Sequence, residues 1–339
     1  MVTYRGFQTV VVTGDETSYG TGSSPATVIK GRIESVSTNE SNNIVRIAGL
    51  GEGRNETAQL YGNYEIKWDM EYVPASFEFL RYGIGSQGGS GTTAAPYFLK
   101  EEEFMDYTAT DAFGMKSFGM IINSLDKSGG THDKVLIEGC IMDTIGLTLS
   151  LGQALKARVS GFARKPTTSS VTTAFTADTT KPWIFSQGQF KWNGSAVARV
   201  TSATINITNT FNEETGRQIS SRFVDAAEPG LRKYEWTITV KMTDAVATSL
   251  RAAFFGAASA PDSGVLAAEI PGYAIILALS EGVASTNRNA SINLSECRIN
   301  DISKPINIGD NIVELTINGI AKAGTTDTTN RPIKWYTTT

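Results

Sequence analysis

Apolar and polar residues alternate along much of this chain with a period of two. The clearest segments are YEIKWDMEY at 64–72 and YEWTITVKM at 234–242. Such alternation predicts antiparallel strands with one buried face and one wet face. A helix is predicted after each strand, within VPASFEFLRYG at 73–83 and TDAVATSLRAAFFG at 243–256. Pro74 suits a first helical turn, and Thr243 or Asp244 can cap the second helix.

These two stretches belong to a longer internal repeat. At an offset of 170 residues Asn39 falls on Asn209 (209 − 39 = 170), Tyr64 on Tyr234 and Leu80 on Leu250. In each half a strand that ends in Asn is followed by a long loop, a second strand and a helix. Trp68 and Trp236 fall in the matching second strands, with a shift of two residues or on opposite faces, and we interpret both as core or subunit-interface residues.

A second block repeats at a smaller offset. Cys140 falls on Cys297 (297 − 140 = 157) and Gly152 on Gly309, and each glycine is followed by another alternating strand. The smaller offset predicts about 13 additional residues in the first half (170 − 157 = 13), near Gly83–Lys116. We interpret the repeat as a duplication.

Residues 166–182 separate the two halves and include the Ser/Thr-rich run TTSSVTTAFTADTT, which is typical of an extended linker. The predicted organisation is a first β domain at 1–165, with an N-terminal arm and the insertion near 83–116, and a second β domain at 183–339. The predicted fold class is therefore mainly β: two tandem β-sandwich or barrel domains, each flanked by one short α-helix.

Composition fits two globular domains and narrows the function. The 339 residues are 40% hydrophobic and 19% charged, with a formal charge of −4, which argues against a basic nucleic-acid reader. No apolar run approaches the ~18 residues that cross a bilayer, and the first residues lack the apolar stretch of a signal peptide. We expect folding in a cytoplasm and no membrane insertion by this chain.

Candidate catalytic and metal-binding residues are few. The chain has one histidine, His132, in a turn-like SGGTHDK, so a His-based triad or a two-histidine metal site within one chain is excluded. Cys140 and Cys297 occupy matching strands, which favours small buried apolar residues over a disulfide.

Two further motifs have structural interpretations. Gly83–Gly88 fits the dinucleotide-binding string GxGxxG but follows a helix instead of opening one, so we expect a helix C-cap and a flexible loop. The acidic run Glu101–Glu103 with Asp106 lacks calcium-loop spacing, which favours a solvated loop. We therefore predict that the chain has no catalytic, cofactor-binding or metal-binding residue, and that it is not an enzyme.

The second half resembles the major tail tube proteins of tailed phages. The resemblance rests on VTSATINITNTFNEETGRQISSRFVDAAEPGLRKYEWTITVKMTDAVATSLRAAFFG and on CRINDISKPINIGDNIVELTINGIAKAG. It spans most of 28–165 and 190–323, less clearly in the first half. It implies a β-sandwich per domain, six domains closing a ring, and rings stacking into a virion tail tube assembled in the host cytoplasm.

The resemblance also implies partners and contacts. The chain would bind itself, hold tape-measure protein and genomic DNA in the lumen, and meet tail terminator and distal tail proteins at the ends. The long loops, about Glu40–Gly62 and Thr210–Leu231, and the N-terminal arm would contact neighbouring rings. With two domains per chain, the hypothesis is a trimeric ring with pseudo-sixfold symmetry.

Three alternatives remain open at this stage. An inner tube protein of a contractile injection or secretion system shares the fold. A tandem β-sandwich surface-binding module predicts a monomer. A hydrolase would need loop carboxylates gathered in one cleft.

Overall fold

The computed structural model describes residues 9–23, 25, 27–48, 56–92, 95–101, 115–125, 131–168, 180–197, 199–214, 216–225, 227–243, 254, 272–282, 288–305, 313–322 and 332–336. The fold is mainly β, as predicted, and every strand pair is antiparallel among the described residues.

The strands up to the middle of the chain are β1 (Thr9–Asp15), β2 (Thr27–Val28), β3 (Gly31–Ser41), β4 (Val45–Ile47), β5 (Ala58–Leu60), β6 (Glu65–Pro74), β7 (Gly85–Gly88), β8 (Tyr97–Glu101), β9 (Phe118–Leu125), β10 (Thr131–Ser150), β11 (Lys156–Ala163) and β12 (Lys165–Thr168). Those that follow are β13 (Gly188–Trp192), β14 (Ser195–Ala196), β15 (Val200–Thr208), β16 (Lys233–Lys241), β17 (Tyr273–Ser280), β18 (Asn289–Ser303), β19 (Glu314–Lys322) and β20 (Ile333–Tyr336).

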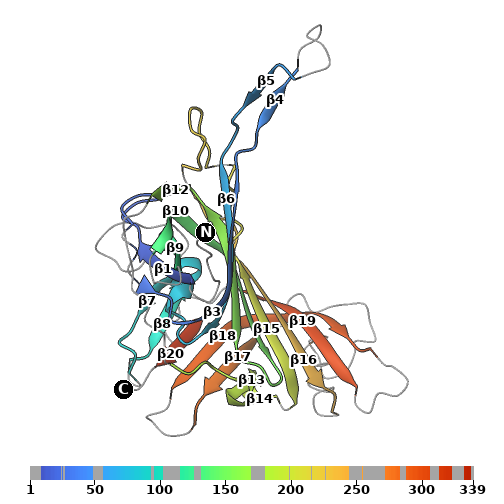
Figure 1. The fold of residues 1–339 in the computed structure, drawn as a ribbon. Helices are drawn as coiled ribbons and strands as arrows, with labels where there is room; N and C mark the ends of the chain where they lie inside the picture. Colours follow the sequence, from blue (N-terminus) through green and yellow to red (C-terminus); the bar gives the residue numbers. More distant parts are fainter. Residues whose placement is uncertain are drawn as a thin grey trace.

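Eight strands form one continuous sheet in the order β3–β6–β11–β10–β15–β16–β19–β18. In Figure 1 this sheet runs from the blue β3 and β6 to the orange β18 and β19 and fans out toward β16. The first half of β10 also pairs with β9 and β12, and the first half of β18 with β17 and β20. The β4–β5 hairpin projects far beyond the body (Figure 1).

The alternating pattern gives this sheet two different faces. In β6 the side chains of Ile66, Trp68, Met70 and Tyr72 are buried, while Lys67, Asp69 and Glu71 point to the other face. β16 repeats the pattern with Tyr234, Trp236, Ile238 and Val240 buried. Because side chains of a strand alternate between faces, each strand contributes one apolar and one polar row.

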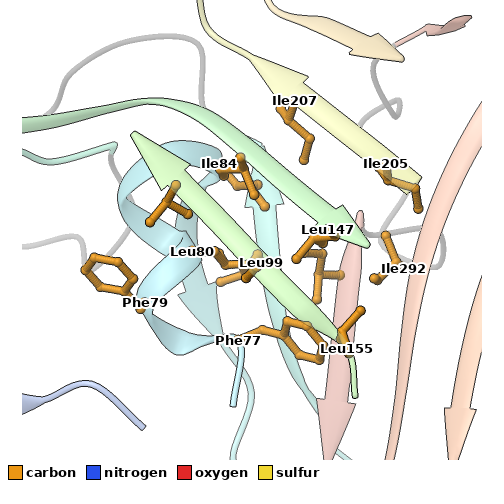
Figure 2. Close-up of a cluster of buried hydrophobic side chains, with 14 of the residues drawn as sticks. Phe77, Phe79, Leu80, Ile84, Leu99, Leu147, Leu155, Ile205, Ile207 and Ile292 are labelled. Atoms are coloured by element: carbon orange, nitrogen blue, oxygen red, sulfur yellow. The ribbon is translucent and has the colours of Figure 1, made fainter. Parts of the chain in front are cut away.

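The helical segment of the first half covers the middle of the sheet. A 3-10 turn, η2 (Glu78–Leu80), continues into α1 (Arg81–Ile84). Figure 2 shows Phe77, Leu80 and Ile84 packed against Leu147 of β10 and Ile205 and Ile207 of β15, with Leu99, Leu155 and Ile292 beside them. Burying such side chains is worth about 2 kcal/mol each, so this cluster holds the helical segment on the sheet.

The helix prediction was right in place but wrong in detail for the first half. Pro74 ends β6 and does not begin the helix, since the chain turns through Ser76 before η2. Gly83–Gly88 is also not a flexible loop after the helix. Gly85 follows α1, but Gly85–Gly88 forms β7, which pairs with β8. The second predicted helix falls almost wholly on residues 244–253 and 255–256, outside the described residues.

The first residues of the expected linker at 166–182 belong to a strand, because Lys165–Thr168 forms β12 against Val135–Glu138 of β10. Residues 169–179 lie outside the described part of the chain. A second 3-10 turn, η3 (Phe185–Gln187), precedes β13. The division into domains at 1–165 and 183–339 remains a prediction.

Candidate assembly surfaces

The two halves of the eight-stranded sheet have matching irregularities. The bulge of β3 against β6 lies between Ile33 and Ser35, and that of β15 against β16 lies between Val200 and Ser202 (200 − 33 = 167). The bulge of β10 against β11 lies between Met142 and Thr144, and that of β18 against β19 lies between Ile299 and Asp301 (299 − 142 = 157). A bulge locally bends and twists a strand, so two strands of each half, β3 and β10 in the first and β15 and β18 in the second, bend at matching places.

The two tryptophans repeat one hydrogen bond. Trp68 lies opposite Gly161, and its Nε1–H donates to the carbonyl oxygen of Phe162 at 3.2 Å. Trp236 lies opposite Gly319 and donates to the carbonyl oxygen of Ile320 at 3.3 Å. Both indoles are buried, and these two residues match at an offset of 168 (236 − 68 = 168). Of the two possibilities left open for the tryptophans, the buried rows therefore select the two-residue shift.

Matching backbone conformations follow the same offsets. Asn43 (φ 43°) lies two residues after the end of β3, and Thr210 (φ 49°) lies two residues after the end of β15 (210 − 43 = 167). Gly139 (φ 69°) and Glu296 (φ 49°) precede Cys140 and Cys297 (296 − 139 = 157). A positive φ is uncommon outside glycine, so its recurrence is specific. The positive-φ residues that follow β3 and β15 are 167 residues apart, three fewer than the 170 of the sequence alignment.

The halves are joined by strand pairing between β10 and β15. Thr144 lies opposite Thr208, Gly146 opposite Asn206, and Ser150 opposite Ser202. Asn209, buried just after β15, donates from Nδ2 to the carbonyl oxygens of Met142 (3.0 Å) and Gly83 (2.8 Å). The second part of β10, in the first half, therefore pairs with β15, in the second half.

The outer edges of the same sheet are open in the described chain. β3 pairs only with β6 in the described residues, and Asp301–Ser303 of β18 pair only with β19. The residues Ser37–Glu40, Asp301 and Ser303 are exposed. An open strand edge presents unpaired backbone N–H and C=O groups, to which another chain can add a strand.

The polar face of the sheet is rich in cross-strand pairs. Lys156 Nζ lies 2.6 Å from Glu34 Oε2 and 3.0 Å from Glu71 Oε1, and hydrogen bonds to these two carboxylates raise its pKa. Arg158 Nε lies 3.0 Å from Asp69 Oδ2. In the second half Thr237 donates to Asn318 Oδ1 at 2.8 Å. Because the charges are paired, the face has no strong single-sign field.

A loop of the second half caps the first half. Residues Thr210–Leu231 lie between β15 and β16, and Phe211 packs on Phe162 with ring centroids 6.0 Å apart. Val224 and Ala227 bury Ile141 and Phe162, and Arg164 Nη2 pairs with Asp225 Oδ1 at 2.8 Å. Hydrogen bonds from Ser221 and then Arg164 hold the pKa of Asp225 below its usual value.

The same loop also holds the base of the projecting hairpin. Arg222 donates from Nε to the carbonyl oxygen of Gly62 (2.9 Å) and from Nη2 to Asn42 Oδ1 (2.8 Å). Tyr64 and Phe223 stack edge to face at 5.7 Å. The hairpin itself leaves a group of large apolar side chains exposed: Ile44, Val45, Ile47, Leu60 and Tyr61.

The residues that sequence analysis singled out do not come together. Cys140 and Cys297 are buried free thiols in β10 and β18, as predicted, and burial raises the pKa of each, that of Cys297 to about 12. The backbone of His132 belongs to β10 and not to a turn, and its side chain lies outside the described residues. Glu101 accepts a hydrogen bond from the Tyr234 hydroxyl, whereas Glu102, Glu103 and Asp106 are not described.

The surface has open hollows of mixed character, and one of about 360 Å³ is lined mainly by apolar side chains such as Phe185, Phe190 and Leu277. One of about 400 Å³ lies on the polar face of the first half, lined by Ser37, Asn39, Lys67, Asp69, Asp143, Ser160 and Glu213 among others. Within the described residues no three His, Cys, Asp or Glu side chains gather so as to hold a metal ion. No helix of the described part is long and apolar enough to span a membrane.

The contact of Phe211 with Phe162, where the loop of the second half meets the first half, was not predicted from the sequence. The residues at the matching positions of the other halves were not predicted either. The hydrophobic pattern of the sequence does not mark them, because an offset of 168 keeps the alternation in phase with one of 170, and only the strand registers distinguish the two.

The fold is that of a β-sheet subunit. Pairing of β10 with β15 joins its two halves, and in the described residues the outer edges at β3 and at the end of β18 have no partner strand. Comparison with known families gives the class a name. The family model for phage tail tube protein matches residues 6–321, and the chain belongs to that family. No curated protein matches the sequence. The family has a structural role in the virion tail, which points to a non-enzymatic function for this chain.

Proposed function

We propose that this chain is the major tail tube subunit, that three copies close a ring, and that stacked rings form the conduit through which a phage genome is delivered. The observation that carries the proposal is the strand pairing of β10 with β15 inside the chain. The corresponding edge strands, β18 and β3, are exposed and open.

In this proposal the two halves of the chain are duplicated tail tube domains, at 1–165 and 183–339, and residues 166–182 join them. Support comes from the matching bulges, the paired tryptophan bonds and the matching positive φ angles. If the halves are equivalent, the second half of one copy meets the first half of the next as the halves meet within one chain. Three copies then supply six equivalent positions.

Equivalence also predicts the register between copies. Thr144 lies opposite Thr208 in the chain, so the corresponding pair between copies is Asp301 (144 + 157) opposite Ser41 (208 − 167). Likewise Gly146 opposite Asn206 gives Ser303 opposite Asn39. Pairing of this kind removes both exposed edges, as closure of a barrel does, and the same heterologous contact repeated around an axis closes a ring.

The polar face of the closed sheet would line the bore. Its carboxylates lie beside Lys and Arg, as in the pairs of Lys156 with Glu71 and of Arg158 with Asp69, and hydroxyl and amide groups fill much of the second half. A surface without a strong positive field does not hold the phosphate backbone, because phosphate binding needs unpaired Lys and Arg. Genomic DNA and tape-measure protein are the proposed lumenal partners, and terminator and distal tail proteins those at the ends.

Electron microscopy of the purified chain at rising concentration tests this function. Hollow filaments of uniform width are the expected result. A chain that stays monomeric at all concentrations, also when tape-measure and terminator proteins are added, would contradict the proposal and favour a surface-binding module.

A further inference from the structure

Two exposed apolar side chains occupy positions whose counterparts are in contact with each other. Phe162 is only 4% exposed because Phe211 and its neighbours cover it. The counterpart of Phe162 is Ile320, which accepts the matching tryptophan bond and is 52% exposed. The counterpart of Phe211 is Ile44 (211 − 167 = 44), which is 53% exposed.

The residues two positions before Phe211 and Ile44 are both asparagines, and again one is buried and the other exposed. Asn209 is 1% exposed and bonds to the backbone of Met142, and its main-chain N–H donates to the carbonyl oxygen of Asp143 at 2.9 Å. Asn42 is the counterpart of Asn209 (209 − 167 = 42) and is exposed. A buried Asn needs hydrogen-bond partners, whereas an exposed one has water. The counterparts of Met142 and Asp143 are Ile299 and Asn300.

We propose that the segment Asn42–Asn43–Ile44 of one copy docks on the second half of the next copy, with Ile44 covering Ile320 and Asn42 bonding to the backbone of Ile299. This inference rests on the proposed function, since it takes a second copy of the chain as the partner. It differs in kind from a contact between stacked rings: the segment that leads into the projecting hairpin acts sideways, within one ring.

The conformation needed for docking is already present. Asn43 adopts φ 43°, close to the φ 49° of Thr210 that turns Phe211 onto Phe162. Arg222 holds the segment in place through Asn42 Oδ1 and the carbonyl oxygen of Gly62. A segment that is held in its bound conformation loses little entropy on binding. The side-chain amide of Asn42 keeps its Nδ2 donors for the neighbouring copy.

The two isoleucines of one chain are too far apart to meet. Ile44 follows β3, and Ile320 belongs to β19, which lies six strand spacings from β3 across the sheet, or roughly 29 Å at about 4.8 Å a strand. A link between positions 44 and 320 therefore joins two copies. The native cysteines do not interfere, because both are buried with raised thiol pKa values.

Chemical cross-linking tests the docking. The variant Ile44→Cys/Ile320→Cys is assembled, treated with a short bis-maleimide and run on a denaturing gel, beside the control Ile219→Cys/Ile320→Cys. Ile219 is 99% exposed in the same loop as Phe211 but has no counterpart in the contact. Covalent dimers and trimers are expected from the first variant, with no larger species, and unlinked chains from the control.

A second pair of variants measures the energetic effect. Burying an isoleucine against another supports assembly, so Ile320→Asp is expected to raise the concentration needed for assembly at least about tenfold. Leu151→Asp, at a 62% exposed position in the turn between β10 and β11, is expected to leave it unchanged. Filaments that form from the double-cysteine variant without any 44–320 link would overturn the docking and leave the tube standing. Linked rings without filaments would support the docking and contradict the tube.

Discussion

The indole Nε1–H of Trp68 donates to the carbonyl oxygen of Phe162 at 3.2 Å, across a strand pair in which Gly161 stands opposite the tryptophan. The ring comes close to the glycine, since a Cβ at Gly161 would lie only 3.1 Å from Cζ2 of Trp68. Trp236 makes the same arrangement with Gly319 and Ile320. Each half of the sheet thus has a large aromatic side chain fixed at both its ring face and its N–H.

Replacement of either glycine is therefore expected to destabilise the subunit. A Cβ at Gly161 would lie 1.8 Å from the Ile141 carbonyl oxygen, and one at Gly319 would lie 2.2 Å from the Trp236 ring. Both distances force backbone or ring to move, so Gly161→Ala and Gly319→Ala should each cost about 2 kcal/mol of unfolding free energy in a denaturant titration. Gly146→Ala is the control, because its Cβ would lie 3.2 Å from the Asn206 side chain and 3.7 Å from the Arg158 carbonyl oxygen, neither of which requires the backbone to move. Equal stability of all three variants would contradict the packing argument.

The two cysteines should be unreactive in the folded subunit. Burial raises the pKa of both thiols, so the reactive thiolate is scarce at neutral pH, and reagent access is blocked. A colorimetric thiol titration at pH 8 is expected to detect no reactive thiol in the native protein and both after denaturation. Rapid reaction of either cysteine without denaturant would show that β10 or β18 opens in solution.

Acid should weaken the contact between the Thr210–Leu231 loop and the first half. Hydrogen bonds from Ser221 and Arg164 lower the pKa of Asp225 below its ordinary 3.8. A lowered pKa means that the carboxylate contributes stability above pH 3.8 and loses it as the pH falls through the folded value. Asp225→Asn should therefore reduce the melting temperature at pH 7, and the difference from the wild type should shrink toward pH 3. Exposed Glu214, replaced by Gln, is the control. A pH-independent difference would assign the effect to packing.

Removal of the projecting hairpin is expected to separate folding from assembly. The β4–β5 hairpin extends beyond the body and exposes Val45, Ile47 and Leu60, so it adds little to the core (Figure 1). Replacing 46–60 by a short Gly-Ser turn keeps Ile44 and should leave the melting temperature within a few degrees, whereas filaments should fail to elongate. Normal filaments from this variant would exclude the hairpin from contacts between rings.

Much of the strand content could be predicted from the sequence, because β6 and β16 alternate so regularly that each buried row is evident. The helix of the first half lies where it was predicted but begins several residues later, since Pro74 suits both the first turn of a helix and the end of a strand. Of the Gly83–Gly88 prediction, the helix C-cap is confirmed at Gly85, and the flexible loop is wrong for a related reason. Glycine and serine favour loops locally, but pairing with β8 overrides that preference.

The offset between the halves shows what pattern alone cannot resolve. Tyr64 and Tyr234 look equivalent in sequence, yet Tyr234 belongs to the buried row of β16 and Tyr64 precedes β6. A shift of two residues keeps the alternation in phase, so hydrophobicity cannot distinguish 168 from 170. Bulges and positive φ angles can, and with them the relation of Ile44 to Phe211 becomes visible.

The most direct test of the account is a cryo-electron microscopy reconstruction of assembled filaments, solved without imposing symmetry. The account predicts three chains per ring, with Ser41 of one copy opposite Asp301 of the next and a continuous sheet of six equivalent domains around the bore. Six chains per ring, or β3 and β18 edges that face solvent in the filament, would contradict the closure of the ring by internal duplication.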